Sequence, residues 1–197
     1  MTPIVLASLS ATRATILRNA GVPFAVAPSG VDENAVKASM LENGQTPAAV
    51  ASALAAAKAT TVSMQQNGLV IGADQTLEMD GHLYDKPETL QTVRARLLLL
   101  RGRSHTLHTS VCVAQSGAIV WRHDQQSVLE MRSFTEQFID DYVDHHGEEL
   151  MSSVGAYQLE HGGIQLFDRI DGDFFTILGL PLLPLLNFLR QAGGVEA

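Results

Sequence analysis

The sequence predicts an α/β protein built on a mixed β-sheet. Early in the chain, short apolar runs alternate with helix-like segments, as where 4–7 is followed by 11–20. In the middle, Asp80-Gly81 and Ser116-Gly117 each separate two strand-like runs, which is the pattern of β-hairpins. Parallel strands need long crossovers whereas hairpins join antiparallel strands, so we expect a sheet that contains both. No repeat or low-complexity linker divides residues 1–197, which we expect to form a single domain.

Local signals set the ends of the expected elements. Ser10, Thr46 and Thr135 can each cap a helix, and Gly21 and Gly102 are helix stops. The predicted helices are 11–20, 32–42, 47–64, 88–100, 135–145 and 182–191, with a loop leading into the last one. The predicted strands are 4–7, 23–28, 69–73, 104–114, 119–131 and 164–170, with a hairpin over 76–84.

The composition excludes several classes of function. The chain is 46% hydrophobic and 17% charged, which suits a folded core. Thirteen basic and 21 acidic residues give a net charge of −8, which argues against nucleic acid as a partner but allows a nucleotide in a local cationic pocket. The sole cysteine, Cys112, lies in an alternating strand-like run and is expected to be a buried structural thiol in a reducing compartment.

We expect a cytoplasmic protein without a membrane partner. No basic residue precedes the first apolar run, and no signal-peptide cleavage region follows it. The longest apolar stretch, 174–189, is interrupted by Pro181 and Pro184 and is shorter than the roughly 20 residues of a membrane span.

Charged and hydroxyl side chains occur where the apolar elements end. Ser8, Ser10 and Arg13 follow the first strand, where free backbone N–H groups at a helix start favour an anion. Asp74 follows the run 69–73, and Lys86 lies just beyond the 76–84 hairpin. Ligands of α/β enzymes bind outside the strand ends, and this mixture of cations and carboxylates suits a phosphorylated, metal-bound substrate.

Each candidate also has a purely structural explanation, which the local pattern leaves open. Arg13 can be a solvated residue after a capping serine, and Asp74 can be a turn or cap aspartate. Lys58 is the only charge in the helical run 47–62, where it can extend to water or point at an anion. Glu33 can be a solvated residue at a helix start.

A series of short motifs covers nearly the whole chain in a fixed order. They are Leu6-Ala7-Ser8-x-Ser10-x-x-Arg13, Asp32-Glu33, Ala57-Lys58-Ala59, Gly72-Ala73-Asp74-Gln75, Lys86-Pro87, Leu100-x-Gly102, Thr109, Gly155-Ala156-Tyr157 and Gly179-Leu180-Pro181-Leu182. This series resembles the Maf family of nucleoside triphosphate pyrophosphatases, and within it the subfamily that acts on 7-methyl-GTP.

The resemblance implies a fold, an activity and a set of site residues. The fold is an elongated, curved mixed sheet with flanking helices forming two lobes around a cleft, similar to inosine triphosphate pyrophosphatase. The activity is hydrolysis of a nucleoside triphosphate to a monophosphate and pyrophosphate by a cytoplasmic, commonly homodimeric enzyme that uses Mg²⁺ or Mn²⁺. Asp74 is the implied proton acceptor and, with Glu33, the implied metal ligand. The implied phosphate-binding residues are Ser8, Ser10, Arg13, Lys58 and Lys86.

Three positions of the resemblance concern the base. Thr12, Gln75 and Glu160 match residues that vary with substrate in the family. Gln75 and Glu160 fit the 7-methyl-GTP set, whereas Thr12 fits neither that set nor the dTTP/UTP set. A carboxylate at Glu160 can accept hydrogen bonds from the ring N–H and the amine of guanine.

The chain departs from the family pattern at Ala11, Ala14 and Asp85. Asp85 stands where glycine is usual and could add a metal ligand or repel a phosphate. Alternative functions are a dTTP/UTP pyrophosphatase, a phosphoesterase that releases orthophosphate, and a non-catalytic nucleotide-binding regulator of septum formation.

Overall fold

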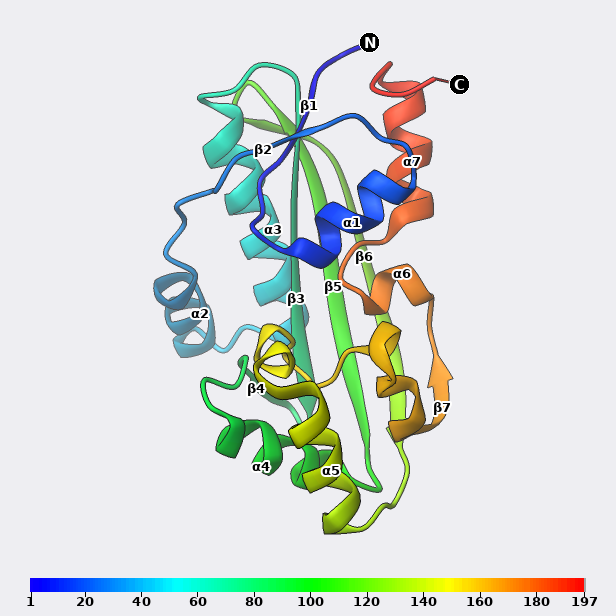
Figure 1. The fold of residues 1–197 in the computed structure, drawn as a ribbon. Coiled ribbons are helices and arrows are strands. Elements are labelled where there is room, and N and C mark those ends of the chain that lie inside the picture. Colours follow the sequence, from blue (N-terminus) through cyan, green and yellow to red (C-terminus); the bar gives the residue numbers. More distant parts are fainter. Residues whose placement is uncertain (197) are drawn as a thin grey trace. The chain divides into compact units, whose positions relative to one another are not determined.

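A computed structural model describes residues 1–196 and shows a mixed α/β architecture (Figure 1). Seven strands form one sheet in the order β2-β1-β3-β5-β6-β7, and β4 pairs with β3 outside this path. β1 (Ile4–Leu6) is parallel to both β2 (Ala25–Val26) and β3 (Leu69–Met79). Antiparallel pairs join β3 to β4 (His82–Tyr84) and β6 (Ala118–Met131) to β7 (Phe167–Asp171). The expectation of a sheet with both kinds of pairing is therefore confirmed.

The chain folds into two compact units. The first comprises residues 1–75, 108–125 and those from 173 onward, and the second comprises 76–107 and 126–172. The helices of the first unit are α1 (Ala11–Asn19), α2 (Glu33–Glu42), α3 (Pro47–Ser63), α6 (Phe174–Ile177) and α7 (Leu182–Gln191). The second unit holds α4 (Leu90–Leu100), α5 (Glu136–His146) and the 3₁₀ turns η1 (Gly147–Ser152), η2 (Leu159–His161) and η3 (Gly163–Leu166). The remaining strand, β5, spans Ser104–Gln115.

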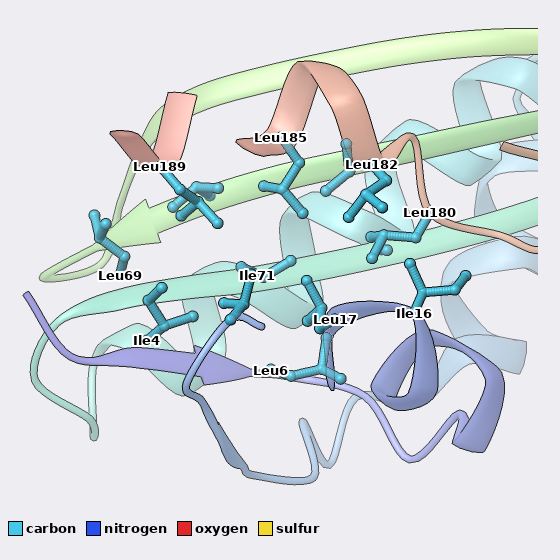
Figure 2. Packing of buried hydrophobic residues seen from close by; sticks show 14 residues of the cluster. Ile4, Leu6, Ile16, Leu17, Leu69, Ile71, Leu180, Leu182, Leu185 and Leu189 are labelled. Atoms are coloured by element: carbon cyan, nitrogen blue, oxygen red, sulfur yellow. The ribbon is translucent and has the colours of Figure 1, made fainter. Parts of the chain in front are cut away.

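One face of the strands in the first unit packs against α1 and α7. Successive side chains of a strand point to opposite faces, so alternate residues of β1 and β3 share this core. Figure 2 shows the cluster, in which two residues of α1 and three of α7 meet the strand residues. Its labelled members are Ile4, Leu6, Ile16, Leu17, Leu69, Ile71, Leu180, Leu182, Leu185 and Leu189.

The opposite face of β3 packs closely against α3. A Cβ atom added to Gly72 would lie 2.3 Å from the carbonyl oxygen of Ala55 and 2.6 Å from the backbone nitrogen of Ala59. The strand and helix backbones therefore meet here at a distance that only glycine allows. Alanine is abundant in α3 because small side chains on that helix face let the two backbones approach.

Buried polar groups and ion pairs organise the second unit. The Arg94 guanidinium of α4 binds Asp140 at 2.6 Å and Glu136 at 2.9 Å, both on α5. His105 of β5 is buried, and its Nε2 lies 2.8 Å from the hydroxyl of Tyr157.

Several predicted elements differ from the structure. β3 continues to Met79, so Asp74 lies within a strand, because the second half of β3 pairs with β4. The strand expected at 23–28 shrinks to two residues. The strand expected at 164–170 forms as β7 only from Phe167 onward, because η3 occupies the residues before it. The short helix α6 was expected to be loop. A strand edge and a four-residue helix depend on tertiary partners, which local patterns do not contain.

Most other expectations are confirmed. Ser10, Thr46 and Thr135 cap α1, α3 and α5 as expected. Both hairpin turns form, with positive φ at each of their two central residues. Cys112 is buried. Among residues 1–196, no helix is both long and apolar enough to cross a bilayer.

The close contact at Gly72 generates a stability prediction. Gly72→Ala should lower the free energy of unfolding by about 3 kcal/mol, because the new methyl group meets the backbone of α3 rather than a movable side chain. Denaturant titration measures the change. Gly30→Ala is the control, since nothing lies within 4 Å of its added Cβ, and its left-handed φ of 65° should cost about 1 kcal/mol. Equal losses in the two variants would contradict the close packing.

His105 generates a pH prediction. Burial, aided by the charge of Arg96, lowers the pKa of His105 from 6.5 to about 4. The unfolded chain therefore takes up this proton below about pH 6.5, whereas the folded chain takes it up only near pH 4. Stability should fall by up to about 3 kcal/mol as the pH drops from 6.5 to 4, a loss that denaturant titrations measure at each pH. His105→Gln should flatten this part of the stability curve, and parallel curves for the two proteins would count against the assignment.

Candidate functional site

A buried lysine brings two carboxylates of the first unit together. Lys58 lies in the middle of α3, and its side chain is only 7% exposed. Its Nζ lies 2.6 Å from Oδ1 of Asp74 and 2.8 Å from Oε1 of Glu33. A buried ammonium is stable only with such charged partners. Lys58 therefore points at two acidic groups and does not extend to water.

The tight packing of β3 on α3 explains why this ion pair forms. Asp74 lies two residues beyond Gly72, so both residues belong to the strand face that meets α3. Lys58 lies one residue before Ala59, whose backbone contacts Gly72. Asp74 itself is buried, with a side chain 9% exposed, whereas the Glu33 side chain at the start of α2 is 44% exposed. The site thus has a buried Lys58–Asp74 pair and a half-exposed carboxylate at its margin.

The turn between β1 and α1 arranges hydroxyl groups around Arg13. Ser10 is the N-cap of α1, and its Oγ accepts a hydrogen bond from the Arg13 backbone N–H at 3.3 Å. The Oγ of Ser8 accepts from the Ser10 N–H at 3.2 Å and from Nη1 of Arg13 at 3.4 Å. Nε of Arg13 donates to the carbonyl oxygen of Gly179 at 2.8 Å. Two different backbone segments therefore orient the guanidinium.

The same guanidinium responds to both carboxylates. Burial lowers the pKa of Arg13, while the charges of Asp74 and Glu33 raise it. Arginine stays protonated at neutral pH despite such shifts. Arg13 and Lys58 thus place two cations in the field of the same two acids.

The Gln75 side chain lies on the opposite face of β3 from Asp74. Its Nε2 is 2.8 Å from Oγ1 of Thr109, 3.0 Å from the carbonyl oxygen of Thr176 and 3.1 Å from that of Ile177. Carbonyl oxygens only accept hydrogen bonds, so the amide nitrogen must be the atom that faces them. An amide that keeps these contacts has both N–H groups in use and can offer a ligand only its oxygen.

Glu33 and Asp74 are the residues that could hold a divalent metal. Among residues 1–196, no three His, Cys, Asp or Glu side chains are grouped so that they could hold an ion alone. Mg²⁺ is commonly bound by one or two carboxylates together with phosphate oxygens of a substrate. Two carboxylates that share one lysine fit a metal whose coordination the substrate completes.

The second unit carries Lys86 at the end of the β3–β4 hairpin. Lys86 is exposed and lies two residues after the end of β4, ahead of the buried Pro87. The guanidinium of Arg96 stacks on the neighbouring Tyr84 ring at 4.8 Å and donates to the Val154 carbonyl at 2.5 Å. Burial lowers the pKa of Arg96, and the groups of Tyr84 and Asp85 raise it. The Arg96 side chain therefore packs against the segment that carries Lys86, and it interacts electrostatically with Asp85.

Glu160 and Thr12 are both accessible. Glu160 lies in η2 and is exposed, and Thr12 is a half-buried residue in the first turn of α1. Burial raises the pKa of Tyr142 to about 12, and the negative charge of Glu160 adds to that shift.

The structure thus brings Ser8, Ser10, Arg13, Glu33, Lys58 and Asp74 together within one unit. Thr12 and Gln75 belong to the same unit, whereas Lys86 and Glu160 belong to the second. Thr109 and Gly179 both lie in the quoted motifs, but no role was predicted for either residue. The sequence pattern did not identify Arg96 or Thr176 as functional residues. Arg96 is one of two arginines in its helix, and Thr176 is a single threonine in an apolar stretch.

Comparisons with known proteins identify the family of this chain. The family model described as Maf-like protein matches residues 3–192. A protein of Caulobacter vibrioides is 51% identical over 195 residues, covering 99% of this chain and 98% of its own length. A protein of Rhodospirillum rubrum is 47% identical, covering 97% and 95%, and one of Maricaulis maris is 46% identical over both complete chains. All three are named nucleoside triphosphate pyrophosphatase.

One solved structure is also similar, that of a HAM1 protein from Coxiella burnetii. It has a TM-score of 0.40 and 16% identity, covering 66% of this chain and 73% of its own. The match to the family model and the identities of 46–51% over nearly complete lengths show that this chain belongs to the Maf family.

Proposed function

We propose that this protein hydrolyses a nucleoside triphosphate to a nucleoside monophosphate and pyrophosphate. The observation that carries the proposal is the buried Lys58, which joins Asp74 and Glu33 in the field of Arg13. The two cations, Lys58 and Arg13, can interact with the oxygens of a polyphosphate. The two carboxylates can bind a metal ion and accept a proton. The names of the relatives support the same reaction.

In the proposed mechanism, a water molecule attacks the α-phosphorus and Asp74 accepts its proton. Because Lys58 contacts Oδ1 of Asp74, we assign the proton to Oδ2. Arg13 can offer two parallel N–H groups to phosphate oxygens, and Ser8 and Ser10 hold it at the start of α1. Lys86, supported by Arg96, is a further proposed cation for the phosphates, where it stabilises charge on the leaving pyrophosphate.

Glu33 and Asp74 are the proposed ligands for Mg²⁺ or Mn²⁺. The metal would neutralise phosphate oxygens when it is bound together with the substrate. In that arrangement Lys58 keeps the two carboxylates near each other, because its positive charge offsets the repulsion between the two negative charges.

The proposed base is a guanine, such as that of 7-methyl-GTP. With its nitrogen bound to three oxygens, Gln75 can offer a base only an acceptor, and the Glu160 carboxylate is also an acceptor. Guanine presents a ring N–H and an amine to such groups, whereas uracil and thymine each present one ring N–H. The alternative is a UTP or dTTP pyrophosphatase, since Thr12 provides no aromatic ring to stack on a methylated base.

The first prediction of the mechanism concerns Asp74. Asp74→Asn should lower kcat by about 10²–10⁴-fold, because the amide cannot accept the proton of the attacking water. Release of pyrophosphate measures turnover, and a thermal unfolding curve shows that the variant is folded. Asp32→Asn is the matched control, because Asp32 caps α2 one residue before Glu33 and asparagine caps equally well. Turnover of Asp74→Asn within tenfold of the wild type would exclude Asp74 as the base.

The second prediction concerns the reaction and the base. Purified protein with Mg²⁺ or Mn²⁺ should release pyrophosphate from 7-methyl-GTP with a higher kcat/KM than from UTP or dTTP. In ¹⁸O-labelled water the label should enter the monophosphate, since water attacks the α-phosphorus. Orthophosphate as the product would instead indicate a phosphoesterase, and tight binding without turnover a regulatory protein. A higher kcat/KM for UTP or dTTP would overturn the guanine assignment but leave the reaction intact.

A further inference from the structure

The carbonyl group of Gly179 lies against the guanidinium of Arg13. Nε of Arg13 donates to this oxygen at 2.8 Å. Gly179 has a φ of 97°, and an added Cβ would lie 3.3 Å from Nε and 3.4 Å from Nη2 of Arg13. The Gly179 backbone therefore packs on one edge of the guanidinium, in a conformation that favours glycine.

The residues before Gly179 form a short helix that depends on side-chain contacts. Helix α6 has four residues, too few to be stable alone. Oδ2 of Asp173 accepts from the backbone N–H of Thr176 at 2.8 Å and from its hydroxyl at 2.9 Å. These two bonds fix the N-terminal end of what we call the α6 segment, residues 173–180.

Two strand residues bind the last two residues of helix α6, Thr176 and Ile177. The hydroxyl of Thr109 donates to the carbonyl oxygen of Thr176 at 3.1 Å. The amide of Gln75 donates to the carbonyl oxygens of Thr176 and Ile177, and to the Thr109 hydroxyl itself. Thr109 is 2% exposed and Thr176 is fully buried, so water cannot replace the lost bonds easily. The hydroxyl of Thr109 is thus the junction of this network, because it both accepts from Gln75 and donates to Thr176.

We infer that Thr109 is a positioning residue for Arg13, acting through the α6 segment and the carbonyl of Gly179. This inference rests on the proposed function, in which Arg13 binds the phosphates. Nε of Arg13 is bonded to Gly179 and Nη1 to Ser8, so the network orients the guanidinium and leaves its remaining Nη N–H groups for the anion. Thr109 touches no part of the substrate in this account, so its loss acts only where the orientation of the guanidinium matters. A misplacement of about 1 Å can reduce a rate about 10²-fold.

A double-mutant cycle between Thr109 and Arg13 tests the inference. Thr109→Val keeps the shape of the side chain but removes the hydroxyl, and Arg13→Lys keeps the charge but removes the Nε that bonds Gly179. Thr109→Val should lower kcat/KM about tenfold or more in the wild-type background and less than about twofold in the Arg13→Lys background. Coupled residues show such non-additivity, whereas independent ones do not. An equal factor in both backgrounds would overturn the inference.

Two further variants separate positioning from folding. Thr109→Ser restores the hydroxyl and should recover kcat/KM to within about twofold of the wild type. Ser110→Ala removes the neighbouring buried hydroxyl, which makes no hydrogen bond to Gln75 or Thr176, and should leave kcat/KM unchanged. Failure of Thr109→Ser to recover kcat/KM would contradict the inference. So would a loss of kcat/KM in Ser110→Ala as large as that in Thr109→Val.

A binding version of the cycle is independent of turnover. Calorimetry with inorganic tripolyphosphate and Mg²⁺ gives the Kd of each variant, and Thr109→Val should raise it at least tenfold only where Arg13 is present. If the wild type binds tripolyphosphate but releases no pyrophosphate from any nucleotide, the proposed function fails and this cycle still decides the role of Thr109. If the wild type is active and both cycles are additive, the function stands and the inference fails.

Discussion

The buried ammonium of Lys58 is the interaction on which the candidate site depends. A lysine with a side chain 7% exposed requires compensating charge, and two carboxylates supply it. Asp74 also requires Lys58, because it is buried inside a strand, where an unpaired carboxylate would be costly. Lys58 and Asp74 therefore compensate each other's buried charge, and this ion pair holds the Asp74 carboxylate in place.

The backbone contact at Gly72 makes this ion pair possible. A long side chain such as lysine reaches Asp74 at 2.6 Å because α3 lies directly on β3, with the Gly72 position against Ala55 and Ala59. The composition of α3 follows from the same constraint. Alanine is a strong helix former, and its short side chain also lets the strand backbone approach the helix closely. One residue type therefore serves both local helix stability and close packing.

The two proposed functional residues of β3, Asp74 and Gln75, lie on opposite faces of the strand and are held by different kinds of interaction. Asp74 faces α3 and receives its charge partner from that helix, whereas Gln75 faces the α6 segment and is fixed by neutral oxygens. Arg13 belongs to the second environment through Gly179, yet the charges of both acids raise the pKa of its guanidinium. The strand thus places the proposed proton acceptor, Asp74, and the proposed base-binding residue, Gln75, on its two faces at successive positions.

Sequence patterns predicted the parts of this arrangement that depend on local signals. Helix caps, hairpin turns and the cationic turn after β1 follow from residue types at fixed spacings, and Ser10, Thr46 and Thr135 act as expected. The convergence of Lys58 with Glu33 and Asp74 could not be predicted from periodicity, because Lys58 is separated from each acid by more than a dozen residues. The family resemblance identified these residues without saying what holds them together.

The α6 segment shows most clearly why the remainder could not be predicted. Its sequence, Phe174-Phe175-Thr176-Ile177, is mostly apolar and was predicted to be a loop, and its helical state depends on Asp173, Thr109 and Gln75. Two of those residues lie more than 60 positions away, so no window of sequence contains the interaction. A threonine in a strand pattern is ordinarily explained by β-propensity alone. In the structure, however, the hydroxyl of Thr109 bonds to Gln75 and Thr176, an interaction that β-propensity does not predict.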